Sequence, residues 1–438
     1  MNWSWEELNQ RARRLNVDRT RAFRYLQHIK NVFPDRQAAW ETVEYYLSYL
    51  EAFLTGMLAP ITLGTLPRAL STGKALIGVA ITGAVDNGRL YLQQTAVTLC
   101  AIHFLHNILV CGMMGSGKTR LVMALGYYCR RGILFDREGE YLPLAAARRD
   151  IVALHYREGF RHNPFFTLNL PAEQREPYLL KLAEVISGKA GLFDGSHSVL
   201  VHAILTLDRN GRRQFGPRFV LTLNDLIAYL RKRVMEGRLS ITEKQYHDRV
   251  LARLSLLDDE LGDVFNTQSS MLPYLHDRFI ILGLAGLSDR GAAHLANIIH
   301  VFHQFSMPVL QHVKFRAARF LDEGHIFASK ADSYAGENPF ATGFLRDRKR
   351  GCGNIYCTQN PSLIHELITN NCRTRIYFCQ GSTQEAEAAA RDLFGSDMTS
   401  QHVQAIQFLP PRFCFIKHPE SRVPLLVKVR RVTPPTIE

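Results

Sequence analysis

The hydrophobic residues of this 438-residue chain change their spacing near residue 106. Before residue 60, apolar side chains recur with the period of a helix, as between Asp35 and Leu47, and Ser4 with Glu7 has the pattern of a helix-capping box. From residue 106 on, short unbroken apolar runs alternate with amphipathic stretches. This pattern predicts an α/β domain that follows a smaller helical region.

The second part of the chain contains apolar runs of strand length. Several lack alternation between apolar and polar residues, which is typical of a mostly parallel sheet covered on both faces. The predicted strands are 106–112, 132–136, 151–154, 278–282, 317–322, 353–358, 374–380 and 412–416. The charge-free stretch 95–117 is expected to be a buried strand, and residues 170–275, mostly helical and charged, are expected to be a helical insertion.

Between these parts, residues 61–105 contain short β-like runs at 75–82 and 89–92, with Asp86-Asn-Gly88 as a turn signal. The predicted organisation is therefore a helical accessory or docking region at 1–60, a short β element at 61–105, and the main domain at 106–438 with its insertion at about 170–275.

Charge and composition narrow the class of protein. Lys and Arg number 53 against 40 Asp and Glu, a net charge of +13, which favours a polyanionic partner, nucleic acid before an acidic membrane surface. The N-terminus lacks a signal-peptide pattern, and no charge-free stretch predicts an integral membrane segment. The eight cysteines have no C-x-x-C spacing, so zinc is not indicated and a reducing, cytoplasmic location is expected.

Residues 112–119 read Gly-Met-Met-Gly-Ser-Gly-Lys-Thr, a complete phosphate-binding loop between an apolar run and an amphipathic stretch. Glycines let the backbone N–H groups face phosphates, and the following helix adds its positive end. Lys118 is expected to reach the β- and γ-phosphates of ATP, and the Thr119 hydroxyl to ligate Mg²⁺. The predicted nucleotide-binding residues are Gly112, Gly115, Ser116, Gly117, Lys118, Thr119 and Arg120.

Two adjacent carboxylates, Asp322 and Glu323, follow Ala317-Ala-Arg-Phe-Leu321, which has the pattern of a strand. In enzymes with such a loop, an Asp at a strand end holds Mg²⁺ and a neighbouring Glu polarises the attacking water. The alternative is an acidic helix start favoured by the helix dipole. We predict Asp322 as a metal ligand and Glu323 as the general base.

The run 354–357 also ends in polar residues, Thr358 and Gln359. Neighbouring strands of a doubly wound sheet end on one edge, so Gln359 is expected to contact the γ-phosphate or the water. The alternative is an ordinary polar turn before Pro361.

Four basic residues surround Asp347 in the segment Arg346-Asp-Arg-Lys-Arg350. They fit a solvated helix face, a DNA contact, or an arginine finger for a neighbouring subunit, with Arg346 and Arg348 as the finger candidates. Arg373 and Arg375 are rival candidates for the finger.

Acidic residues also follow the run 132–135, at Asp136, Glu138 and Glu140. They are expected either to support the metal or orient the phosphate loop, or to form a turn with solvated charges. His300 and His303, with His294 and His312 nearby, lack a third ligand of known spacing, so a partly buried helix face is expected rather than a metal site.

These blocks together resemble the HerA/FtsK superfamily of ATP-driven DNA pumps over about residues 100–400. The resemblance rests on His106, the loop 112–119, the block Phe135 to Tyr141, the block Leu321 to Phe327, Arg348-Lys349, and Cys357 to Ser362. Type IV secretion coupling and assembly ATPases share most of these blocks, and Asn370 to Thr374 resembles the latter. The chain departs from the family where Asn360 stands in a place that often holds Arg.

The resemblance implies a RecA-like P-loop core, a homo-hexameric ring with ATP sites between subunits, and double-stranded DNA in the central channel. The leading hypothesis is an Mg²⁺-dependent ATPase that translocates DNA as a HerA-like pump or helicase. The alternatives are a type IV secretion or conjugation motor, and a nucleotide-gated scaffold that docks a nuclease or other effector through residues 1–60.

Overall fold

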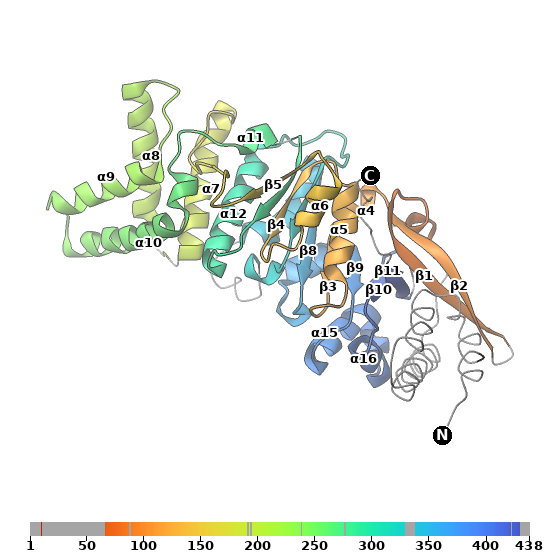
Figure 1. Ribbon diagram of the computed structural model, residues 1–438. Helices are drawn as coiled ribbons and strands as arrows, with labels where there is room; N and C mark the ends of the chain where they lie inside the picture. Colours follow the sequence, from red (N-terminus) through yellow and green to blue (C-terminus); the bar gives the residue numbers. More distant parts are fainter. Residues whose placement is uncertain are drawn as a thin grey trace, which may run out of the picture. The chain divides into compact units, whose positions relative to one another are not determined.

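The structure is a computed structural model that describes Gln10 and residues 66–86, 89–190, 192, 195–237, 239–275, 277–328, 338–421 and 423–429. They belong to two compact units, each described by itself below (Figure 1). The first unit includes residues up to Leu99, the loop Cys111–Lys118, and Ile376–Arg430, and the second includes Cys100–Val110 and Thr119–Arg375. Apart from the helical Gln10, the helical region predicted at 1–60 lies outside the described residues.

The first unit is built on strands in the order β2-β1-β11-β10-β9, of which β2, β1, β11 and β10 pair antiparallel. The hairpin of β1 (Ala75–Asp86) and β2 (Arg89–Leu99) is longer than the short runs that the sequence predicts, because backbone pairing continues in register to Asp86 and Arg89. β11 (Leu425–Val429), which the sequence analysis missed, joins β1 to β10 (Phe413–Lys417). The other elements are η1 (Arg68–Leu70), β9 (Thr374–Tyr377), α15 (Thr383–Phe394), η6 (Gly395–Asp397) and α16 (Ser400–Gln407).

The second unit contains the parallel sheet that the apolar runs predict. Its strands lie in the order β3-β8-β7-β4-β6-β5, and the five from β8 to β5 are parallel. Their bounds are β3 (Ile108–Cys111), β4 (Gly132–Asp136), β5 (Ile151–His155), β6 (Phe279–Gly283), β7 (Ala317–Leu321) and β8 (Cys352–Thr358). All side chains of β7 and β8 are buried, which explains the lack of alternation in these runs.

Helices cover both faces of this sheet. Successive residues of a strand point to opposite faces. Phe320 packs edge-on against Phe279, on the face where α5 (Lys118–Tyr128) brings Gly126 close to Phe279. Arg319 points to the other face and lines a pocket with His303 of α12 (Asp289–Ser306). The arrangement is a RecA-like α/β core, as the sequence resemblance implies.

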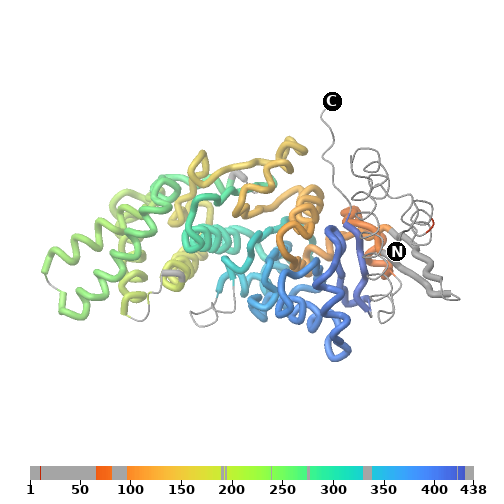
Figure 2. Tube along the Cα trace, turned by 60° about the horizontal axis from the view of Figure 1, so that its bottom comes forward, coloured from red at the N-terminus to blue at the C-terminus, as the bar shows by residue number. Residues whose placement is uncertain are grey.

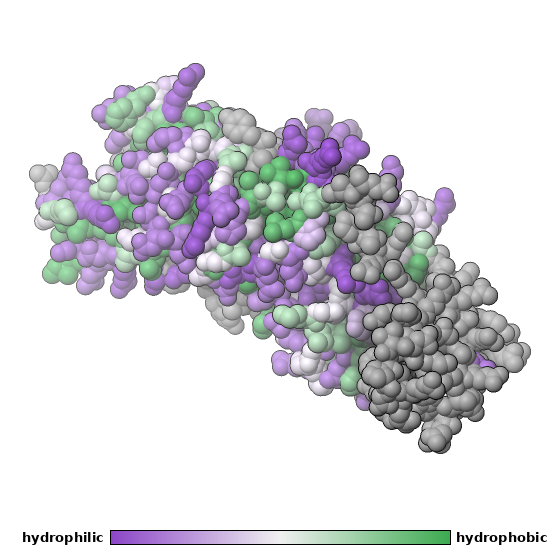
Figure 3. Space-filling view, in the orientation of Figure 1, coloured by the Kyte–Doolittle hydropathy of each residue, from purple (hydrophilic) through white to green (hydrophobic). Residues whose placement is uncertain are grey.

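The predicted helical insertion lies between β5 and β6 (Figures 1 and 2). It comprises α7 (Ala172–Ala190), α8 (Gly195–Phe215), α9 (Leu223–Met235), α10 (Ile241–Phe265) and the short α11 (Leu272–Leu275). Thr222 and Ser240 form capping boxes that start α9 and α10. Tyr178 of α7 packs against Phe302 and Phe305 of α12, which joins the insertion to the core. Many hydrophilic side chains cover the insertion on the face in view in Figure 3.

The chain enters and leaves the insertion at one place. His162 and Ser270 form an isolated bridge, and the Ser270 hydroxyl lies 2.7 Å from Nδ1 of His162. Next to them, the Asn163 amide donates to the carbonyls of Leu221 and Thr267. These buried contacts connect the two ends of the insertion directly.

The prediction of a buried strand across 95–117 is wrong for its middle. In the second unit, α4 (Ala101–Leu105) interrupts this stretch before β3 begins. Its first turn is stabilised because the Cys100 backbone N–H donates to Nδ1 of His103. Among the residues that the structure describes, no helix is long and apolar enough to cross a membrane.

Candidate functional site

The phosphate loop of the first unit has the backbone shape that the motif requires. Gly115 and Gly117 have φ of 74° and 116°, in the left-handed region that disfavours residues with a Cβ. At Gly112 a Cβ would lie 2.5 Å from the Cβ of Phe378, so only glycine fits against that side chain. Glycine is therefore required at Gly115 and Gly117 by the backbone conformation, and at Gly112 by the neighbouring side chain.

Lys118 and Ser116 both bond to one carbonyl inside the loop. The Lys118 ammonium donates to the Met113 carbonyl at 3.2 Å, and the Ser116 hydroxyl donates to the same oxygen at 2.7 Å. Lys118 is 8% exposed, whereas Met114 at the tip is 68% exposed. The lysine is therefore held over a loop whose tip faces solvent.

The C-terminal segment of the first unit supports this loop through its backbone. The Met113 N–H donates to the Cys379 carbonyl, the Phe378 N–H to the Cys111 carbonyl, and the Arg412 N–H to the Ser116 carbonyl, each at 2.8 Å. Sequence reasoning assigned no role to Phe378, Cys379 or Arg412, because backbone support leaves no residue-type signal. Arg412 itself has a left-handed backbone conformation, with a φ of 73°.

In the second unit, the Thr119 hydroxyl donates a 2.6 Å hydrogen bond to Glu140. Glu140 belongs to a turn built around Asp136, which is fully buried and accepts from the N–H groups of Gly139, Glu140 and Tyr141. Burial raises the pKa of Asp136, and these backbone bonds oppose that rise. Asp136 therefore shapes the turn, and Glu140 is the residue that reaches Thr119.

Asp322 and Glu323 follow β7 at the same edge of the sheet. Asp322 is 8% exposed. The pKa of the nearby Tyr141 hydroxyl is raised, first by the burial of Tyr141 itself and next by the negative charge of Asp322. Glu323 has a left-handed backbone, with φ and ψ both 50°, directly before η2 (Gly324–Ile326). Such a conformation in a non-glycine residue costs about 1–3 kcal/mol and is found most often at functional sites.

Gln359 contacts Glu323 across neighbouring parallel strands. Its side-chain amide donates to Oε1 of Glu323 at 2.6 Å, and Nδ1 of His325 lies 3.4 Å from Oε2. Gly324 permits this turn because a Cβ there would lie 2.6 Å from the Tyr356 ring. The ends of β4, β7 and β8 thus bring Glu140, Asp322, Glu323 and Gln359 to one edge of the parallel sheet, together with Thr119.

The basic segment 346–350 is not a uniform solvated face. It covers the end of α13 (Pro339–Arg346) and the turn η4 (Asp347–Arg350). Arg346 and Arg348 are exposed, whereas Asp347 is fully buried and accepts from Arg319. Asn354 also donates to Asp347. A buried acidic anchor therefore holds the segment while its arginines face solvent.

The remaining arginine candidates lie just before and within β9. Arg373 is exposed, and its backbone N–H donates to the His106 carbonyl. Arg375 is half-buried, and its Nε donates to the Cys372 carbonyl, so its guanidinium is partly engaged. Arg120 is exposed in the first turn of α5.

The described residues contain no group of three or more His, Cys, Asp or Glu side chains placed to hold a metal ion. His300 is fully buried in α12, and burial lowers its pKa well below the usual value. Mg²⁺ needs few protein ligands, because it keeps waters and phosphate oxygens. The Thr119 hydroxyl and the Asp322 carboxylate are oxygen donors of the kind it prefers.

Solved structures of known proteins share the fold of this chain. No protein-family profile and no curated protein matches the chain. Among solved structures, VirB4 of Thermoanaerobacter pseudethanolicus is similar with a TM-score of 0.57 and 15% identity, over 81% of this chain and 96% of that one. The bacterial conjugative coupling protein TrwBdeltaN70 gives a TM-score of 0.57 at 13% identity, over 83% and 90%.

A third structure, the plasmid coupling protein TrwB in complex with ADP and Mg²⁺, has a TM-score of 0.58 at 14% identity, over 85% of this chain and 97% of that one. These identities establish a shared fold. They confirm the RecA-like P-loop fold and agree with the resemblance to the HerA/FtsK superfamily and its type IV secretion relatives.

Proposed function

From the fold shared with VirB4 and TrwB, we propose that this chain is the ATPase motor of a conjugation or type IV secretion machine. The observation that carries this proposal is the complete phosphate loop, with its lysine and two left-handed glycines, on a core of that fold. The similarity to two secretion and conjugation proteins favours this reading over the HerA-like pump as the first choice.

We propose that the loop N–H groups and the Lys118 ammonium bind the phosphates of ATP, with Lys118 moving from the Met113 carbonyl to a phosphate oxygen. Arg120, exposed in the same helix turn, contacts the nucleotide from outside the loop. Thr119 and Asp322 hold Mg²⁺, which when bound neutralises charge on the phosphates. TrwB has been solved with ADP and Mg²⁺, which supports these cofactors.

Glu323 is proposed to take the proton of the attacking water. Its Oε1 already accepts from Gln359, which fixes the carboxylate, and Gln359 responds to the γ-phosphate from that position. A general base contributes roughly 10²–10⁴-fold to such a reaction.

The active assembly is proposed to be a homo-hexamer in which an arginine of one subunit completes the site of the next. Arg346 and Arg348 are the first candidates, because both are exposed beside a buried anchor. Arg373 is the next choice.

Double-stranded DNA is the proposed cargo or track, since the net charge of +13 favours a polyanion. A HerA-like DNA pump or helicase in the cytoplasm, docked to a nuclease or other effector through residues 1–60, is the second candidate function. It is favoured by the same charge and by the sequence blocks shared with that superfamily.

The test is ATP hydrolysis without nucleic acid, with duplex DNA and with single-stranded DNA, using Lys118→Ala as the blank. Turnover above that blank is expected, and its absence would overturn the ATPase proposal. Strong stimulation by duplex supports DNA as the track, and binding should then weaken with salt at a slope of about −0.9 per phosphate contacted. DNA-indifferent turnover would favour protein secretion or a scaffold.

A further inference from the structure

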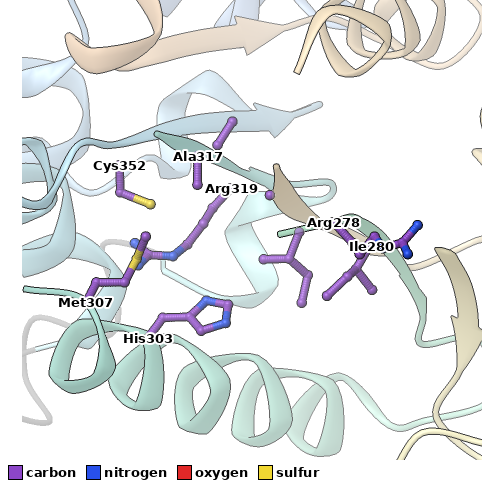
Figure 4. Close-up of a pocket in the computed structure, with 10 residues that line it drawn as sticks. Arg278, Ile280, His303, Met307, Ala317, Arg319 and Cys352 are labelled. Atoms are coloured by element: carbon purple, nitrogen blue, oxygen red, sulfur yellow. The ribbon is translucent and has the colours of Figure 1, made fainter. Parts of the chain in front are cut away.

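A small pocket lies in the second unit at the edge where the parallel strands begin (Figure 4). It is small and opens to solvent. Its lining residues are Gly132, Ile133, Arg278, Ile280, His303, Met307, Ala317, Ala318, Arg319 and Cys352. Because Asp322, Glu323 and Gln359 follow the opposite ends of the same strands, this pocket is separate from them.

The feature that gives the pocket a chemistry is Arg319. In Figure 4 its side chain extends from β7 to lie between Cys352 and Met307, with His303 alongside. It is 1% exposed, and its Nη1 donates to Asp347 and, at 3.4 Å, to Asn354. Within the part of the chain that the structure describes, its Nε and Nη2 have no hydrogen-bond partner. Buried donors are nearly always paired, so these two need an acceptor.

The two unpaired donors specify the shape of that acceptor. Nε and Nη2 lie on one edge of the planar guanidinium, where their N–H bonds run parallel. This edge matches the two oxygens of a carboxylate, which it binds in a bidentate manner. A spherical anion such as chloride engages such a fork less well.

Among the residues that line the pocket, Arg278 is the cation that no acidic lining residue balances. Arg278 stands exposed at the mouth, and none of the lining residues is acidic. Cys352 is a neutral thiol, since burial raises its pKa to about 11. Asp347, which is not a lining residue, pairs with Nη1 of Arg319 and balances its charge, while Nε and Nη2 remain unpaired in the described part of the chain. Asp277 pairs with Arg131.

We propose that this pocket binds a small carboxylate ligand. The head group lies side-on against Nε and Nη2 of Arg319, and Arg278 attracts it at the mouth. Ile133, Ile280 and Met307 provide an apolar wall for a short aliphatic body. A phosphate needs more donors than one buried guanidinium edge supplies, so the carboxylate is the better match.

Occupancy of the pocket would be sensed by the basic segment. Arg319 is the partner of Asp347, the buried anchor between Arg346 and Arg348. A bound carboxylate shares the charge of Arg319 with Asp347, and so connects the pocket with the placement of the two exposed arginines.

The probes are isobutyrate, its uncharged analogue isobutyramide, and inorganic phosphate, each titrated into the full chain and followed by saturation-transfer NMR and calorimetry. We expect saturable binding of isobutyrate and at least tenfold weaker binding of isobutyramide. Isobutyrate should displace no bound phosphate. Equal binding of acid and amide, or tighter binding of phosphate at this site, overturns the proposal.

Two variants place the binding in the pocket. Arg319→Lys keeps the charge but loses the planar fork, and should lower affinity at least tenfold. Because Arg319 is also part of a buried network, Met307→Trp serves as the second variant, since it fills the pocket without removing Arg319. Loss of isobutyrate binding in Met307→Trp at an unchanged unfolding midpoint supports the site. Binding retained in this variant overturns it.

Discussion

Gln359 donates a hydrogen bond of 2.6 Å to Oε1 of Glu323. The two residues follow neighbouring parallel strands and were given separate roles in the sequence analysis. Their contact couples them, because the amide fixes the carboxylate, and in the proposed mechanism a change at the phosphate that Gln359 contacts would reach Glu323 directly. Both this hydrogen bond and the left-handed backbone of Glu323 fix the position of its carboxylate.

Glu323→Gln should separate nucleotide binding from hydrolysis. The amide keeps the size of the side chain but cannot accept a proton, so we expect ATP affinity within a few-fold of wild type and turnover lowered by about 10²–10⁴-fold. Fluorescent-nucleotide binding and phosphate release measure the two quantities. Turnover that stays within a few-fold of wild type would remove Glu323 from the chemistry.

Glu140→Ala should raise the Mg²⁺ concentration needed for half-maximal hydrolysis. Glu140 accepts from the Thr119 hydroxyl and so orients the lone pair that is proposed to ligate the metal. Loss of such an outer partner typically costs about 10–100-fold in metal affinity, and the lower end is expected at this exposed position. Glu138→Ala, two residues away and also exposed, is the matched control and should leave the Mg²⁺ curve unchanged.

Asp347→Ala should destabilise the protein by about 3–5 kcal/mol, because it leaves the Arg319 guanidinium buried without its counter-charge. Urea denaturation measures the loss. Asp150→Ala removes the partner of Arg148, but the Asp150 side chain is 52% exposed, so less than about 1 kcal/mol is expected. Similar losses for both variants would contradict the assignment of Asp347 as an anchor.

The stability of the protein should fall as the pH is lowered from 7 to 5, in part through His162. Burial lowers the pKa of His162 from 6.5 to about 3. In this pH range the unfolded chain takes up a proton at His162 and the folded chain does not, so acid favours unfolding, by about 2 kcal/mol at pH 5. His162→Gln should lose this share of the pH dependence in urea denaturation. His312→Gln, at an exposed position, should retain it.

The fold followed from the sequence wherever local pattern and tertiary environment agree. Strands β4, β7 and β8 are buried on both faces, so their mostly apolar runs predicted their positions to within a residue, although Arg319 and Asn354 interrupt two of them. Helix α4 was missed because apolar periodicity is ambiguous over five residues. β11 was missed because a five-residue run near the C-terminus is defined by its pairing with β1 and β10 rather than by its own composition.

The candidate site was predicted less evenly. Motif residues such as Lys118, Asp322 and Glu323 are recognisable because their chemistry demands a residue type at a spacing. The different roles of Asp136 and Glu140 could not be predicted, because both residues are acidic. Only the three-dimensional contacts show that Asp136 shapes the turn and that Glu140 accepts from Thr119. The burial of Asp347 inside a basic segment also has no signature in the sequence.

The support of the phosphate loop by Cys379 and Arg412 bears on how the protein is made. The N–H of Arg412 and the carbonyl of Ser116 that it binds are 412 − 116 = 296 residues apart. A ribosome must therefore release the chain as far as Arg412 before the loop can make this bond. A growing chain that has not yet exposed Arg412 therefore lacks this support for the loop, although the whole glycine motif has already been made.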